Sequence, residues 1–103
     1  MSELKFIKLG QDEYSIVGEL TFAGINKNTL KSLTFMQGLK QIRFDLNKVS
    51  AIDSAGLAFM LECIQRCQQQ QTRLKFQNIP PQLLALAKLS GLDDIEYFNP
   101  VSS

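Results

Sequence analysis

Short segments with alternating apolar residues are separated by segments with helical spacing, and this order restricts the possible folds more than any other feature of the chain. Patterns typical of strands occupy residues 4–9, 14–20, 42–46 and 73–77. The first two flank a polar turn at residues 10–13 and predict an opening hairpin. Because helices separate the later strands, we expect parallel pairing through right-handed crossovers.

The first of three segments with helical spacing has two candidate caps, Asn26 and Asn28. Leu30 and Leu33 would lie on one face of this helix. Phe35 falls outside that stripe, so we expect either that it is exposed or that the helix ends early.

The second helix is expected from about Ala55 to Gln69, because its apolar residues recur at spacings of three and four. These residues are Leu57, Met60, Leu61, Ile64 and Cys67. A third helix begins at the proline pair of residues 80–81 and ends before Gly91, which can adopt a left-handed stop. Its apolar positions are Leu83, Leu84, Ala87 and Leu89. Residues 95–98 predict a final short strand.

The predicted fold is therefore of the α/β class. A small mixed β-sheet would carry helices packed mainly on one face, and loops or moderately polar side chains would cover the other. A chain of 103 residues with 45% hydrophobic content can bury one modest core. We expect a single domain over residues 1–103.

The chain contains no histidine and no tryptophan, which removes the most frequent general base and the commonest metal ligand. Its net charge is only +1, whereas nucleic-acid binders usually have a basic excess. It has no apolar run of about 18 residues that would predict a membrane span, and its first residues lack the apolar region of a signal peptide. We expect no bound nucleic acid, cofactor or metal, and no enzymatic activity.

Two further groups of residues have simple interpretations. Cys63 and Cys67 are four residues apart in the second helix, where disulfide torsions are hard to reach, and they predict free thiols in the cytoplasm. Asp93, Asp94 and Glu96 form an acidic cluster, which we interpret as a solvated surface because nothing else supplies metal ligands.

The most informative segment is residues 53–57, where a loop enters the second helix. Ser54 is predicted to cap this helix, and it is also a candidate for regulation because exposed N–H groups at a helix start favour a phosphoryl group. Asp53 can cap as well, or hold the loop through its backbone. Gly56 would allow close approach of the helix to a neighbouring chain segment.

One face of the second helix lies opposite its apolar stripe. It carries Ala58, Phe59, Glu62, Cys63 and Arg66. We expect a partner-binding patch formed by Asp53, Ser54, Ala55, Gly56, Ala58, Phe59 and Glu62. Phe59 is the candidate anchor of this patch. The alternative is that Phe59 packs beneath a loop.

Residues 46–57 resemble the central signature of STAS domains, the small domains of anti-sigma-factor antagonists and of sulfate-transporter tails. In that family a D-[S/T]-x-G-L segment joins the third strand to the second helix, and here it reads Asp-Ser-Ala-Gly-Leu. The order of elements also matches the STAS fold along nearly the whole chain.

Two more segments, residues 18–22 and 86–92, resemble the STAS subunit of the bacterial Mla system. That system is an ABC machine that moves phospholipids between the inner and outer membranes. Anti-sigma-factor antagonists usually carry aspartate after the second strand, where this chain has Thr21. This departure favours the Mla type over a phosphorylation switch.

The resemblance implies that Ser54 is the hydroxyl residue at the partner interface, a position where Mla-type members often have threonine. Asp53 and Gly56 match the motif directly, and Ala55 replaces a serine or glycine. Lys88 and Leu89 match the terminal motif, whereas the following residue is serine instead of the usual tyrosine.

The expected function is that of a non-catalytic subunit that binds and stabilises the ATPase of an Mla-type phospholipid transporter, which maintains outer-membrane lipid asymmetry. It would be cytoplasmic and peripheral to the inner membrane through its complex. The alternative is an anti-sigma-factor antagonist switched by phosphorylation of Ser54. A lipid carrier is disfavoured because so small a core would have little room for a large apolar cavity.

Overall fold

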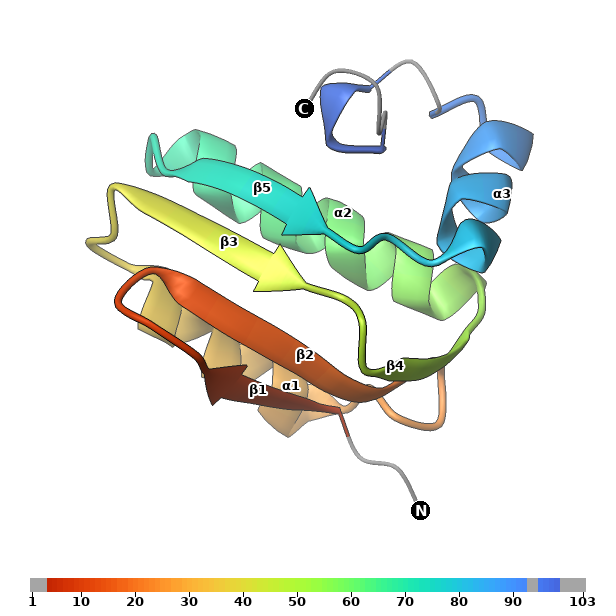
Figure 1. Ribbon diagram of the computed structural model, residues 1–103, viewed down its shortest axis with the longest axis horizontal. Helices are drawn as coiled ribbons and strands as arrows, with labels where there is room; N and C mark the ends of the chain where they lie inside the picture. Colours follow the sequence, from red (N-terminus) through yellow and green to blue (C-terminus); the bar gives the residue numbers. More distant parts are fainter. Residues whose placement is uncertain (1–3, 93–94, 99–103) are drawn as a thin grey trace.

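The computed structural model describes residues 4–92 and 95–98 (Figure 1). The elements in chain order are β1 (Lys5–Lys8), β2 (Glu13–Leu20), α1 (Lys27–Ser32), η1 (Leu33–Met36), β3 (Gln41–Asp45), β4 (Val49–Ile52), α2 (Ser54–Gln69), β5 (Arg73–Gln77), α3 (Pro81–Leu89) and η2 (Glu96–Phe98), where η denotes a 3-10 helix. The two long predicted helices and the opening hairpin are confirmed.

The strands form one mixed sheet in the order β1-β2-β3-β5, with β4 beside the second half of β2. β1 pairs antiparallel with β2, as the hairpin prediction requires. The pairs β2–β3, β2–β4 and β3–β5 are all parallel. The expectation of parallel strands joined by crossovers is therefore confirmed, and the carboxyl ends of the parallel strands lie at one end of the sheet.

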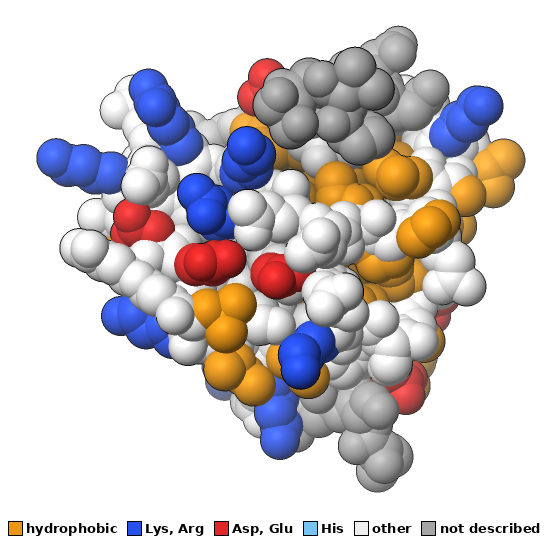
Figure 2. Space-filling model, in the orientation of Figure 1, with side chains coloured by type: hydrophobic (Ala, Val, Ile, Leu, Met, Phe, Trp, Pro, Cys, Tyr) orange, Lys and Arg blue, Asp and Glu red, His pale blue; other side chains and the backbone are white. Residues whose placement is uncertain are grey.

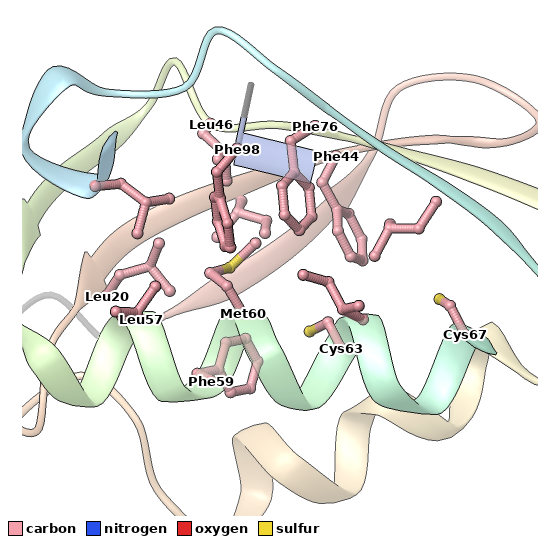
Figure 3. Packing of buried hydrophobic residues seen from close by; sticks show 14 of the residues in the cluster. Leu20, Phe44, Leu46, Leu57, Phe59, Met60, Cys63, Cys67, Phe76 and Phe98 are labelled. Carbon is pink, nitrogen blue, oxygen red and sulfur yellow. The ribbon is translucent and has the colours of Figure 1, made fainter. Parts of the chain in front are cut away.

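Helices α1 and α2 lie on the same face of the sheet, and α3 lies near the end of β5 (Figure 1). The core fills the space between the sheet and α2, where Phe44 and Phe76 stack with ring centroids 6.4 Å apart (Figure 3). Met60 of α2 is fully buried beneath them, as the predicted apolar stripe requires, and so is Cys63, which was predicted on the opposite face of the helix. Burying such residues is the main source of stability for a sheet covered on one side.

The opposite face of the sheet carries polar residues. The outward positions of β3 and β5 include Arg43, Asp45, Arg73, Lys75 and Gln77, which alternate with the buried residues of both strands. This alternation confirms that moderately polar side chains cover the face without helices.

The segment after β2 confirms one predicted cap and resolves the position of Phe35. The Asn26 side chain accepts a hydrogen bond from the Thr29 N–H, and the Thr29 hydroxyl accepts one from the Asn26 N–H. This reciprocal pair fixes the start of α1. The α-helix ends early, at Ser32, and continues as the 3-10 helix η1. This tighter winding turns the ring of Phe35 onto Tyr14, with ring centroids 4.6 Å apart.

Two expectations are wrong, and one strand was not predicted. Residues 96–98 form a 3-10 turn and not a strand, because Phe98 enters the core against Phe76 with ring centroids 5.8 Å apart. Residues 49–52 form the strand β4, which the sequence patterns did not predict. Leu89, expected on the apolar face of α3, is 85% exposed because it lies in the last turn, past the buried Ala87. Asp93 and Asp94 of the acidic cluster lie outside the described residues.

Candidate functional site

The candidate site lies where the parallel strands β2 and β4 end side by side. The connection that follows β2 and the first turn of α2 meet at this end of the sheet (Figure 1). In open α/β sheets, the loops after the carboxyl ends of parallel strands are a usual place for binding sites. The D-S-A-G-L segment is therefore in a position suited to recognition.

Asp53 joins the two loops of the site. Its Oδ1 accepts hydrogen bonds from the N–H groups of Ala55 at 2.9 Å and Gly56 at 3.2 Å, so Asp53 is the cap of α2. Its Oδ2 accepts from the N–H of Phe22 at 3.1 Å. The bond from Phe22, with those from Gly56 and Ala55, holds the pKa of Asp53 below its usual value, against a smaller opposing effect of burial.

Both sequence interpretations of Asp53, as a cap and as a holder of the loop, therefore describe one carboxylate with two roles. Ser54 is not the cap, because it is the first residue inside the helix. Its side chain is exposed, which leaves the hydroxyl accessible.

Gly56 brings α2 close to the end of β2. A Cβ built on Gly56 would overlap the carbonyl oxygen of Leu20 and lie 2.8 Å from the Leu20 Cβ. The predicted close approach is confirmed. The same contact buries Gly56, so its contribution to a partner surface would be indirect, through the placement of the helix.

The connection after β2 is a tight turn held by Thr21. The carbonyl of Thr21 accepts from the N–H groups of Gly24 and Ile25, both at 3.0 Å. Its hydroxyl donates to Glu19 at 3.1 Å and accepts from the Gly24 N–H at 3.2 Å. The residue that departs from the anti-sigma-antagonist pattern thus shapes the loop that Asp53 holds.

Phe22 is the residue of the site that sequence analysis missed as a binding residue. It lies at the tip of this turn and is 83% exposed, although its backbone is fixed by the Asp53 carboxylate. An aromatic residue held on a rigid loop next to a helix start is well suited to anchor a protein partner. The local signal was a large apolar residue immediately after a strand end, inside a turn.

The prediction that Phe59 anchors a partner is wrong. Phe59 is only 4% exposed, and its ring centroid lies 6.1 Å from that of Phe6. Figure 3 shows Phe59 extending from α2 toward the side where α1 runs. Because α2 packs against the sheet on one side and has the α1 segment beside it on another, it has a wider buried face than one stripe predicts. Cys63 is buried for the same reason.

The remaining predicted patch residues lie along one exposed line of α2. Ala58 is exposed one turn after Ser54, and Ala55 is half-buried beside them. Glu62 follows one turn later and pairs with Arg66 at 2.8 Å. Ion pairs with this much exposure contribute about 0–1 kcal/mol. The first two turns of α2 therefore present a surface of small side chains, with the Glu62–Arg66 ion pair at its edge.

The terminal motif lies on the last turn of α3. Lys88 and Leu89 are both exposed, and Leu89 is one of the most exposed large apolar residues in the part of the chain that the structure describes. Figure 2 shows apolar side chains gathered at the end of the molecule where α3 lies.

Both cysteines are free thiols, as predicted. Burial raises the pKa of Cys67 to about 11 and raises that of Cys63 further, with the Cys67 thiol adding to the effect. Neither thiol is therefore suited to nucleophilic chemistry at neutral pH. Among residues 4–92 and 95–98, no three His, Cys, Asp or Glu side chains gather as a metal site requires. No helix in these ranges is long and apolar enough to cross a membrane.

Comparison with known proteins identifies a family and a fold. A family model described as the STAS domain matches residues 12–103. No curated protein matches this sequence significantly.

Solved structures share the arrangement of elements. The anti-sigma factor antagonist SpoIIAA in its unphosphorylated form is 18% identical, with a TM-score of 0.61 over 84% of this chain and 82% of that one. The phosphorylated form of SpoIIAA, a Bacillus cell fate determinant, is also 18% identical, with a TM-score of 0.62 over 86% and 84% of the two chains. A crystal structure of Mglu is 21% identical, with a TM-score of 0.54 over 76% of this chain and 20% of that one. At these identities the likeness establishes the fold alone.

Proposed function

This chain belongs to the STAS domain family, and we propose that it is a non-catalytic subunit that binds and stabilises the ATPase of an Mla-type ABC phospholipid transporter. It would act from the cytoplasmic side, peripheral to the inner membrane. The observation that carries the proposal is the surface formed by Phe22, Ser54, Ala55 and Ala58, which we call the α2 entrance.

The α2 entrance has the properties of a protein-binding surface. Small side chains on the first turns of α2 let a partner approach the helix closely, and Phe22 supplies an exposed aromatic anchor beside them. The Asp53 carboxylate fixes the backbone of both loops, so little conformational freedom is lost on binding. Exposed Leu89 on α3 offers a second apolar contact at the same end of the sheet.

The family resemblance supports the choice of partner. Residues 18–22 and 86–92, which resemble the Mla-type subunit, contain Phe22 and Leu89, which are both large, apolar and exposed at this end. A binding module of this kind regulates through differential affinity: if it binds one conformation or assembly state of the ATPase more tightly, it shifts the population toward that state.

Co-purification with the ATPase subunit tests the proposal. Wild type is expected to bind, whereas Ser54→Arg and Phe22→Asp should each lose most of the bound ATPase. Leu9→Asp is the matched control, because Leu9 is also an exposed apolar residue but lies after β1, away from the α2 entrance. Absence of wild-type binding, or normal binding by both site variants, would refute the proposal.

A second candidate function is that of an anti-sigma-factor antagonist switched by phosphorylation of Ser54. The exposed hydroxyl at the start of α2 supports this second function. The likeness to both forms of SpoIIAA supports the second function as much as it supports the first. A phosphate would add about −1.5 to −2 charges next to the Asp53 carboxylate and change the surface seen by a partner.

Intact-mass measurement after incubation with a partner kinase distinguishes the two functions. The second candidate predicts a mass increase of one phosphate that is lost in Ser54→Ala. No increase, or an increase that survives this substitution, argues against it.

A further inference from the structure

A hollow of about 870 Å³ lies on the face of the sheet that carries no helix, away from the α2 entrance. It extends over the first residues of β3 and β5 and is bounded by the β1–β2 turn and by η2. Small-molecule sites usually have volumes of roughly 300–1,000 Å³. The hollow therefore has the size of a site for a small ligand.

Three cations lie together in this hollow. Arg43 on β3 pairs directly with Lys75 on β5, and Arg73 points to the same face two residues before Lys75. Neighbouring strands are about 4.8 Å apart, and alternate residues of one strand are about 6.6 Å apart. Three long cationic side chains that start this close can converge on a single anionic group.

These cations have no acidic partner among the described residues, since none of them lies within 4.0 Å of a carboxylate there. Like charges that face each other across paired strands cost stability. Figure 2 shows Lys and Arg side chains over β3 and β5, next to Asp and Glu side chains. A bound anion would remove the repulsion between the cations.

The acidic residues of the hollow lie at its margins. Asp12 accepts a hydrogen bond from Gln41 Nε2 at 2.8 Å, and Glu96 on η2 has an interaction of its own. Glu13 pairs in register with Arg43 on the side away from β5. The positive charge is therefore concentrated over the first residues of β3 and β5, where Arg73 and Lys75 have no acidic neighbour in register. Asp45, at the other end of β3 on the same face, lies outside the hollow and accepts a hydrogen bond from Asn78 Nδ2 at 2.9 Å.

From this arrangement we infer that the open face of the sheet binds a small phosphate-bearing anion. Arg43 and Arg73 would each present a guanidinium to phosphate oxygens, and Lys75 would add a point charge. Tyr97 lines the hollow at its η2 margin, and its ring would give an organic part of the ligand a flat surface. The inference is independent of the proposed partner, because it concerns the opposite side of the sheet from α2.

The test is a titration of the isotope-labelled full chain with sodium tripolyphosphate, followed by NMR. Saturable shifts are expected at the amides of β3 and β5, weakened by sodium chloride. Replacing Arg43, Arg73 and Lys75 together by glutamine should lower affinity at least about tenfold. The control replaces Lys27, Lys31 and Lys88 by glutamine, which changes the net charge equally, and should stay within about twofold of wild type.

Two further measurements complete the test. Circular dichroism checks that both triple variants fold, so that a lost signal reports binding. Phosphatidylglycerol vesicles test the source of the phosphate. If the protein co-sediments with the vesicles and the site variant does not, the ligand is a lipid headgroup. If the protein binds tripolyphosphate but does not co-sediment with the vesicles, the ligand is a soluble phosphate compound. The inference is overturned if wild type shows no saturable shifts, if the site variant binds normally, or if the shifts centre on the start of α2.

Discussion

Replacing Asp53 separates its two roles at the α2 entrance. Asp53→Ala removes the acceptor for Ala55, Gly56 and Phe22 together. Loss of a helix cap costs about 1 kcal/mol, and loss of an exposed hydrogen bond costs about 0.5–1.5 kcal/mol. We therefore expect the free energy of unfolding to fall by about 2 kcal/mol. For a chain of this size that corresponds to a melting temperature lower by roughly 10 °C.

Asp53→Asn should give a smaller loss, of about 1 kcal/mol. The amide has a single acceptor oxygen, so it can cap α2 but then turns its NH₂ group toward the N–H of Phe22, which is also a donor. The loop after β2 would detach while the helix start remains capped. The amide shift of Phe22 should therefore change in this variant more than those of Ala55 and Gly56.

The pH dependence gives an independent check with a definite sign. Because the pKa of Asp53 is lowered in the folded state, its contribution to stability is present above the unfolded-state value of about 3.9 and is lost as the pH falls through the lower folded-state pKa. Asp53→Asn should remove this part of the acid sensitivity.

Urea unfolding followed by circular dichroism, at neutral pH and at pH values below 4, measures these effects. If Asp53→Ala changes the free energy of unfolding by less than about 0.5 kcal/mol, the usual effect of a surface substitution, Asp53 does not hold the two loops. If the alanine and asparagine variants have the same stability and the same Phe22 amide shift, the bond to Phe22 is not a separate role of Asp53.

Three other predictions concern packing. Gly56→Ala should lower the free energy of unfolding in urea by about 1–3 kcal/mol, despite the higher helix propensity of alanine. The control Gly10→Ala, where the new Cβ would make an ordinary contact at 3.9 Å, should change it by less than about 1 kcal/mol. Equal effects of the two substitutions would contradict the close approach of α2 to β2. Phe59→Ala should cost about 3–5 kcal/mol and Phe22→Ala less than about 0.5 kcal/mol, and the reverse order would restore Phe59 as the exposed residue. Both cysteine thiols should react with a thiol reagent at pH 8 only as fast as the chain unfolds, so rapid labelling of the native protein would contradict their burial.

Periodicity predicted the main elements correctly because each long helix has an apolar stripe of its own and because β3 and β5 alternate, whereas β2 alternates only imperfectly. The start of α2 was predicted to within one residue, since Asp53 and Ser54 both suit a helix start. Sequence could not decide which of them caps, because that depends on the direction of the backbone leaving β4.

The features that the sequence did not predict have a common physical cause, because each depends on residues that are distant in the sequence. Phe59 is buried by the segment around Phe6, and residues 49–52 become a strand because β2 lies beside them. Phe22 was overlooked because its exposure follows from a turn that Thr21 holds. The cations on the open face became a group only through the register of β3 with β5.

The most direct test of the α2 entrance as the partner interface is an NMR titration of the isotope-labelled protein with the ATPase subunit of the transporter. We predict that the amides of Phe22, Ser54, Ala55 and Ala58 shift or broaden first, while those of the first residues of β3 and β5 on the open sheet face stay unchanged. Absence of binding, or perturbations confined to the open sheet face, would contradict the assignment of the α2 entrance as the partner interface.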